Sequence, residues 1–191
     1  MAKTLDDYIK EVTTLAAGRD LSTRWYREKV RDIVPNKPIT EANFIKNIRK
    51  SYNKTLRPTY GLMNLYYYQP KHEETLPYYD VFPLTIPIKK LKDGFIGINF
   101  HYLDIPLRIK LFEKMQPMSA ENRKIGWSRV AKIRQIKPCV KRYLASQVAS
   151  PFQKITEEEM QIAMLMPVQK FYRKGTRIKE TIVWQESRRM I

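Results

Sequence analysis

One stretch of this chain limits what it can fold into. From residue 122 to residue 156 there is no Asp or Glu, although nine Lys and Arg occur. A soluble helical surface ordinarily interleaves both signs of charge, so these cations cannot be neutralised by neighbours in sequence. The whole chain carries 36 Lys and Arg against 19 Asp and Glu, a net charge of +17. Because self-repulsion of this size opposes a compact state, the sequence predicts surface cations that meet an anionic partner.

Eight of the nine cations are the candidate residues for binding DNA or an acidic protein. They are Arg123, Lys124, Arg129, Lys132, Arg134, Lys137, Lys141 and Arg142, and Lys154 completes the stretch. Arg129 and Lys132 are three residues apart, and Lys137 and Lys141 are four apart, spacings that place each pair on one helical face. The opposite side of the first helix is expected to be core, formed by Trp127, Val130 and Ile133. Such a face suits phosphates or an acidic protein surface equally well.

The pattern of apolar residues divides the chain into three zones, which predict an α+β fold. Residues 1–57 are expected to form a helical arm of short helices that needs a partner surface. Residues 58–191 are expected to form the core domain. Within it, 58–103 is predicted to be a small antiparallel β-meander and 104–191 a basic helical part.

The meander is predicted from aromatic and branched segments separated by a turn at Lys92-Asp93-Gly94. Pro83 and Pro87 cannot donate ladder hydrogen bonds, so their strand is expected to be an edge or a bulged strand. The consecutive Tyr66, Tyr67 and Tyr68 allow stacking on bases. The simpler interpretation is a strand that packs one ring inward and leaves the neighbouring rings half exposed.

The helical part begins at Asp104, a predicted cap for a helix lined by Leu107, Leu111, Phe112 and Met115. A second helix is expected over about 126–136, and a third from Pro138 to about 149. Thr156 with the three glutamates that follow it predicts a capped helix that Pro167 ends. The stretch from Ile178 to Trp184 fits a strand or a helix equally well.

Catalytic and membrane functions are not expected. The chain has two histidines, His72 and His101, and one cysteine, Cys139, which cannot form an intrachain disulfide. We expect His72 to be solvated and His101 to be structural, with Asp104 or Cys139 as its candidate partner. No metal site, cofactor site or small-molecule substrate is predicted. No apolar stretch approaches the roughly 20 residues of a spanning helix, and the N-terminal sequence has no features of a signal peptide or a myristoylation site.

Four segments together resemble a known family. They are the two runs of 76–84 and 94–103, residues 136–144, and the sequence Ala149-Ser150-Pro151-Phe152. In this order they are similar to a family of small basic virion proteins from T4-like contractile-tailed bacteriophages, some of whose members are labelled DNA end protector. The resemblance covers about 60–191 and brings no catalytic residues. It implies that Tyr79, Phe82, Phe100 and Tyr102 define the fold from the core.

Two functional hypotheses follow. The first is a structural subunit of a phage virion, in the tail baseplate, hub or neck. It would contact other virion proteins and turn its basic surface toward acidic subunits or DNA. The alternative is a DNA-binding protein that protects duplex ends independently of sequence. Either protein would be found in the virion and would be assembled in the host cytoplasm.

Overall fold

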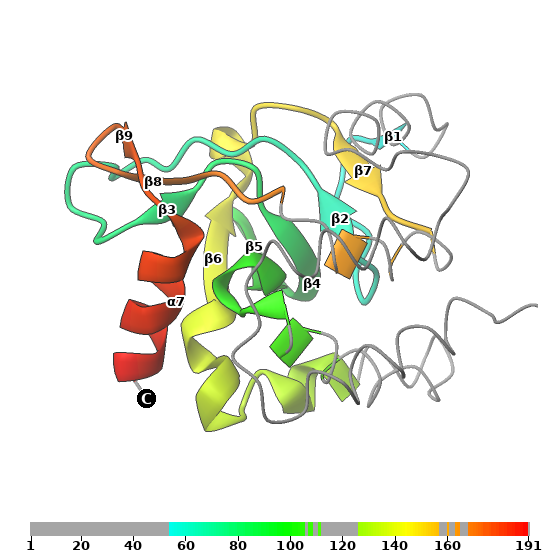
Figure 1. Cartoon of the computed structure of the whole chain (residues 1–191). Coiled ribbons are helices and arrows are strands. Elements are labelled where there is room, and N and C mark those ends of the chain that lie inside the picture. Colours follow the sequence, from blue (N-terminus) through cyan, green and yellow to red (C-terminus); the bar gives the residue numbers. More distant parts are fainter. Residues whose placement is uncertain are drawn as a thin grey trace, which may run out of the picture.

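The computed structural model describes residues 54–105, 107–108, 111, 126–156, 160, 163–164 and 168–190. Within these ranges the fold is mixed α and β, with strands in two antiparallel sheets and a helix at the C-terminal end (Figure 1). The predicted helical arm lies outside the described residues except for 54–57. There the prediction is wrong, because Lys54–Thr55 form strand β1 and pair with β7 of the core sheet.

The larger sheet has six strands in the order β1-β7-β2-β4-β5-β6. Besides β1, its strands are β2 (Asn64–Leu65), β4 (Leu84–Leu91), β5 (Gly94–Asn99), β6 (Val140–Leu144) and β7 (Phe152–Lys154). The predicted meander therefore contributes only three of these strands. The others come from segments before and after it, so pairing between segments distant in sequence completes the sheet.

The β4–β5 hairpin confirms the predicted turn. Leu91 pairs with Gly94, so Lys92 and Asp93 form the two-residue connection. The pairing register shifts between Pro87 and Lys89, which confirms the bulge. The alternative of an edge strand is wrong, because β4 lies between β2 and β5. The bulge lets Pro87 occupy an interior strand without breaking a regular ladder.

The smaller sheet consists of β3 (Tyr79–Asp80), β8 (Phe171–Arg173) and β9 (Thr176–Arg177) in the order β3-β8-β9. Helix α7 (Glu180–Arg189) follows directly. The choice left open for 178–184 is thus resolved mainly as helix. Val183 is fully buried, and the Trp184 indole donates a 2.8 Å hydrogen bond to the His101 carbonyl, which anchors α7 on the core.

The helix predicted from Pro138 to about 149 is wrong. Residues Arg134–Cys139 form the 3-10 helix η2, β6 follows, and Ala145–Gln147 form η3. Tyr143 of β6 is buried with its ring centroid 5.2 Å from that of Phe95 on β5. Gly94 lets the backbones approach, since a Cβ there would lie 1.9 Å from the Tyr143 carbonyl oxygen. Pairing with a distant strand has overridden the local helical spacing.

The preceding segment is shorter than predicted. Residues 126–130 are helical, and Trp127 and Val130 are buried as expected. Ile133 was expected in the core, but it is 46% exposed. Its backbone is extended, at φ −66° and ψ 131°, so the helical spacing that would have turned it inward no longer applies.

Two helix starts agree with the sequence. Asp104 accepts a 3.0 Å hydrogen bond from the Leu107 amide and so acts as a cap. Leu111 is buried, but Leu107 is 39% exposed, contrary to prediction, because it lies in the first turn beside its cap. The Met160 amide donates to the Thr156 carbonyl, as expected for a helix starting there. Phe112, Met115, Pro167 and the glutamates after Thr156 lie outside the described residues.

The core has two clusters of buried side chains. Tyr79, Phe82, Phe100 and Tyr102 are all at most 5% exposed, which confirms them as core. The tyrosine run differs from its prediction, because both Tyr66 and Tyr68 are buried. Tyr67 is partly buried with its ring 4.6 Å from that of Phe82. Burial still alternates along the run, but two rings and not one point inward: Tyr66 and Tyr68 lie in one core cluster, and Tyr67 packs against the other.

Candidate nucleic-acid interface

The eight candidate cations fall into three groups. Arg123 and Lys124 lie outside the described residues. Arg129, Lys132, Arg134 and Lys137 are all exposed within 126–139, a short helix and turn followed by η2, and we call these four residues the basic segment. Lys141 and Arg142 lie on β6. The expectation that Lys137 and Lys141 share a helical face is therefore wrong, because a strand begins at Val140.

The basic segment occupies the lower edge of the molecule in Figure 1. A helical turn joins its first two members, with the Lys132 amide donating to the Arg129 carbonyl at 3.0 Å. Within the described part of the chain, none of its four side chains takes part in an ion pair. Among these described residues, no carboxylate neutralises their charge.

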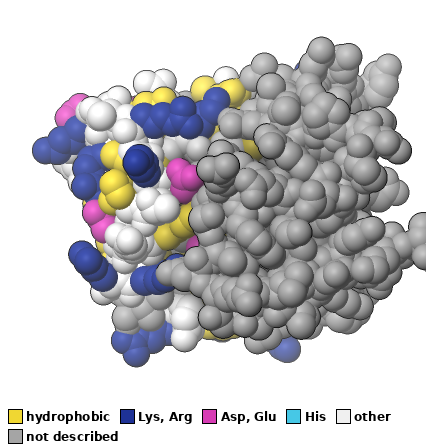
Figure 2. Space-filling view, in the orientation of Figure 1, with side chains coloured by type: hydrophobic (Ala, Val, Ile, Leu, Met, Phe, Trp, Pro, Cys, Tyr) yellow, Lys and Arg dark blue, Asp and Glu magenta, His cyan; other side chains and the backbone are white. Residues whose placement is uncertain are grey.

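Three acidic side chains of the described residues are paired with other cations. Arg142 bonds Asp93 at 2.6 Å, Arg173 bonds Glu186 at 2.7 Å, and Arg188 bonds Asp104. These pairs are at least partly exposed, so each is expected to add little to stability. On the described part of the face seen in Figure 2, dark blue cationic side chains are more widespread than magenta acidic ones.

A second feature is a cavity of about 520 Å³ between the loop before β3 and strand β6. We call it the tyrosine pocket. Five of its lining residues are Tyr68, Tyr78, Tyr79, Tyr102 and Tyr143, and its basic lining residues are Lys71, His72, Lys141 and Arg142. The pocket therefore brings two of the predicted binding cations together with aromatic walls, which the sequence did not predict.

Lys141 is the most unusual cation of this pocket. Its ammonium lies 4.2 Å from the centroid of the Tyr102 ring, a cation–π arrangement. Burial lowers the pKa of Lys141, and the nearby Cys139 thiol only partly opposes that shift. No carboxylate bonds this ammonium in the described part of the chain. A partly desolvated cation of this kind gains from any anion that enters the pocket.

A buried polar network lies at the floor of the pocket and centres on Asp80. One carboxylate oxygen accepts hydrogen bonds from the amides of Phe82 and Lys170, at 3.0 and 3.2 Å. The other accepts from the Asn99 side chain at 3.2 Å and lies 2.6 Å from His101 Nδ1. Asn99 also donates to the Tyr143 hydroxyl at 3.1 Å, which ties the network to the pocket wall.

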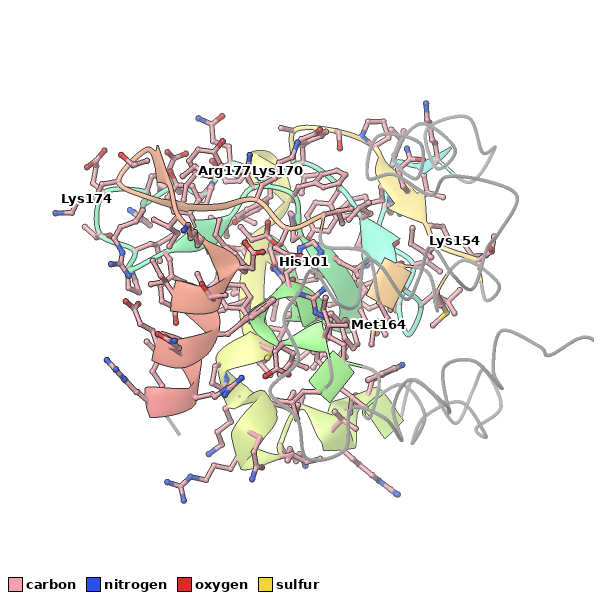
Figure 3. All side chains as sticks on the ribbon, viewed as in Figure 1. His101, Lys154, Met164, Lys170, Lys174 and Arg177 are labelled. Carbon is pink, nitrogen blue, oxygen red and sulfur yellow. The ribbon has the colours of Figure 1, made fainter. Side chains whose placement is uncertain are left out.

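His101 thus pairs with Asp80, and the partners suggested from sequence, Asp104 and Cys139, are wrong. Its side chain is fully buried near the centre of the described part (Figure 3). Burial lowers the pKa of His101, against the opposing effect of the Asp80 carboxylate. Burial also raises the pKa of the Cys139 thiol to about 12, so this thiol is protonated. One signal could have identified Asp80, namely an acidic residue inside an apolar strand, which needs buried partners.

Sequence reasoning also missed Arg108, which is fully buried. Its guanidinium donates to the Leu103 carbonyl at 2.8 Å and to the His101 carbonyl at 3.3 Å. Burial lowers the pKa of Arg108 to about 10, which leaves it charged at neutral pH. The side chain holds the turn after β5 in place, and nothing in the surrounding sequence distinguishes it from the surface cations.

The His101 environment predicts a pH dependence of stability. In the unfolded protein the His101 imidazole binds a proton near its ordinary pKa of 6.5, whereas burial lowers that pKa in the folded protein. Below about pH 6.5 the unfolded state therefore binds more protons, and stability falls as the pH falls, by at most about 1.4 kcal/mol per unit for this group. The free energy of unfolding, measured with urea at several pH values between 7.5 and 5.5, should depend less steeply on pH in His101→Gln than in the matched variant His72→Gln. An equal pH dependence in the two variants would contradict a lowered pKa of His101 as its cause.

Two further observations concern metal-binding groups and membrane-spanning helices. Within the described ranges, no three His, Cys, Asp or Glu side chains come together as a metal-binding group. Among the same residues, no helix has both the length and the apolar character needed to cross a bilayer.

The fold and the surface define a small, strongly basic α/β protein with antiparallel sheets and an exposed cationic segment. Comparison with protein families identifies the family to which the chain belongs. The family model described as phage T4 terminal DNA protecting protein matches residues 2–187, and the chain belongs to this bacteriophage family. The match confirms the resemblance drawn from the sequence and extends it over residues 2–57, which the resemblance did not cover. Comparisons with curated proteins and with solved structures find no match.

Proposed function

We propose that this protein binds the ends of duplex DNA without reading their sequence and shields them, with no catalytic step of its own. The observation that carries the proposal is the family match over residues 2–187, since the family is described by its protection of terminal DNA. Of the two hypotheses drawn from the sequence, this description favours end protection. A place in the tail baseplate, hub or neck and contacts with other virion proteins stay predictions.

The basic segment supports the proposal physically. Its four exposed cations have no acidic partner in the described part of the chain, so phosphates can neutralise them with release of counterions. Contacts to phosphates position a protein on DNA but carry no sequence information, which suits a protein that must act on any end. Arg123 and Lys124 precede this segment in sequence and are proposed to extend it.

The direct test is protection of linear duplex DNA from a double-strand exonuclease. Purified full-length protein at saturating concentration is expected to slow degradation of the linear substrate markedly. An endonuclease acting on nicked circular DNA, which has no duplex end, should be slowed much less. Equal inhibition of both nucleases would indicate a general coat on DNA, and no inhibition of the exonuclease would overturn end protection.

The role of the basic segment can be measured from the salt dependence of DNA binding. Changing Arg129, Lys132, Arg134 and Lys137 together to Gln is expected to weaken binding at least about tenfold at low salt. The slope of log K against log salt should fall by about 3 to 4, because each lost phosphate contact contributes about 0.9.

A matched control removes the same charge elsewhere. Lys92, Lys174, Arg177 and Lys179 are exposed on the β4–β5 turn, on the smaller sheet and just before α7, and Lys174 and Arg177 are labelled in Figure 3 far from the lower edge that carries the basic segment. Changing these four to Gln is expected to lower the slope by about 1 or less. If both quadruple variants behave alike, net charge and not the basic segment determines binding.

A further inference from the structure

The tyrosine pocket has the size of a site for one small group. Its volume of about 520 Å³ lies within the range of about 300–1,000 Å³ typical of small-molecule sites. A B-form duplex, whose major groove alone is about 12 Å wide, is too wide to enter. A single nucleotide unit at the end of a strand is the part of DNA that can.

The walls of the pocket are aromatic and held in place. The Tyr68 and Tyr143 rings pack edge to face at 4.9 Å, and Tyr78 and Tyr102 lie 5.8 Å apart. The Tyr143 hydroxyl accepts a hydrogen bond from Asn99, which is itself bonded to buried Asp80. Each of the five tyrosines is at most 8% exposed, so a base would contact only the ring atoms that line the pocket, and such contacts depend little on base type. A wall fixed in this way also loses little conformational entropy on binding.

The charges of the pocket favour an anion. The Lys141 ammonium is partly desolvated over the Tyr102 ring and has no carboxylate partner in the described part of the chain. Lys71 adds a second, exposed cation at the rim. The two acidic residues that line the pocket are already engaged, Asp80 in its buried network and Asp93 with Arg142. An entering phosphate therefore meets two free cations.

From this combination we propose that the tyrosine pocket holds the terminal nucleotide of a DNA strand, with its base against the tyrosine wall and its phosphate beside Lys141. The inference rests on the proposed function and gives it a mechanism. The basic segment supplies affinity for any phosphate backbone, whereas the pocket accepts only a nucleotide that has a free end. Preference for ends then requires no recognition of sequence.

The test compares a DNA hairpin with one open end and a dumbbell of the same stem closed at both ends. The wild-type protein is expected to bind the hairpin at least tenfold more tightly. Lys141→Met should remove most of that preference. Lys90→Met is the matched control, because Lys90 is an exposed lysine on β4 of the same sheet and does not line the pocket. It should keep the preference, and both variants should weaken dumbbell binding to the same small extent.

A second measurement locates the nucleotide directly. An aryl-azide base is placed either at the open end, on the 5′ or the 3′ strand, or in the middle of the stem, and is cross-linked with light. Peptides from 68–80 or 141–144 should be labelled from a terminal position and not from the middle.

The possible outcomes separate the two proposals. No hairpin preference in the wild-type protein would overturn end binding and the pocket together. A preference that survives Lys141→Met, with terminal cross-links on 126–139, would overturn the pocket alone. Terminal cross-links absent from the pocket, together with specific capture there of an acidic peptide, would assign the pocket to a protein partner.

Discussion

Replacing Asp80 with alanine is expected to lower the free energy of unfolding by about 3–5 kcal/mol. The carboxylate accepts hydrogen bonds from four groups, and Asp80 is only 4% exposed. Removing it leaves buried donors on the Phe82 and Lys170 amides, the Asn99 side chain and His101 without their partner. Urea unfolding of the full chain, followed by far-UV circular dichroism, measures the change.

Asp80→Asn provides an intermediate case, because the amide keeps the shape and one acceptor oxygen but loses the charge that faces His101. We expect a smaller loss of stability than for alanine. The matched control is Asp93→Ala, which removes a carboxylate that is 52% exposed and should change stability by less than about 1 kcal/mol. A loss for Asp80→Ala as small as this control would contradict the structural role of the network.

Gly94→Ala is expected to destabilise the protein by about 3 kcal/mol, through overlap of atoms that cannot easily move. A Cβ at this position would lie 1.9 Å from the Tyr143 carbonyl oxygen and 3.1 Å from the Leu144 Cα. Both are backbone atoms of β6, so the strand must shift away from β5. Because β6 carries Lys141 and Tyr143, the same substitution is expected to weaken hairpin binding.

Gly97→Ala is the matched control on the same strand. Its Cβ would lie 3.3 Å from the Ile86 carbonyl oxygen, a tight contact but not an overlap. Thermal unfolding should therefore show a clearly smaller loss of stability for Gly97→Ala than for Gly94→Ala. Equal losses would mean that close approach of β5 and β6 is not what requires glycine at position 94.

Some of the fold followed from local rules. The turn at Lys92-Asp93, the bulge at Pro87 and the cap at Asp104 were predicted, because each depends on a few consecutive residues. Trp127 and Val130 were also placed correctly, since their spacing lies within one helical turn. Ile133 was not, because the helix ends before it.

The candidate site could be predicted only in part. The unbalanced cations were visible in the sequence, and so was the possibility of a DNA partner. The tyrosine pocket was not, because its walls come from 68–80, Tyr102 and β6, segments that meet only through strand pairing. The Asp80–His101 pair was missed for the same reason, as its members are 21 positions apart, with Asp80 in β3 and His101 in the 3-10 helix Phe100–Tyr102.

The sequence by itself determined the sign and amount of charge, the residues that carry it and the short-range turns and caps, because these depend on composition and on neighbours along the chain. The tertiary structure decided which cations share a surface. Pairing of β6 with β5 replaced the expected helix and separated Lys141 from the exposed basic segment. The physical reason is that burying Tyr143 against Phe95, with Gly94 allowing the backbones to meet, outweighs the weak helical preference of 140–144.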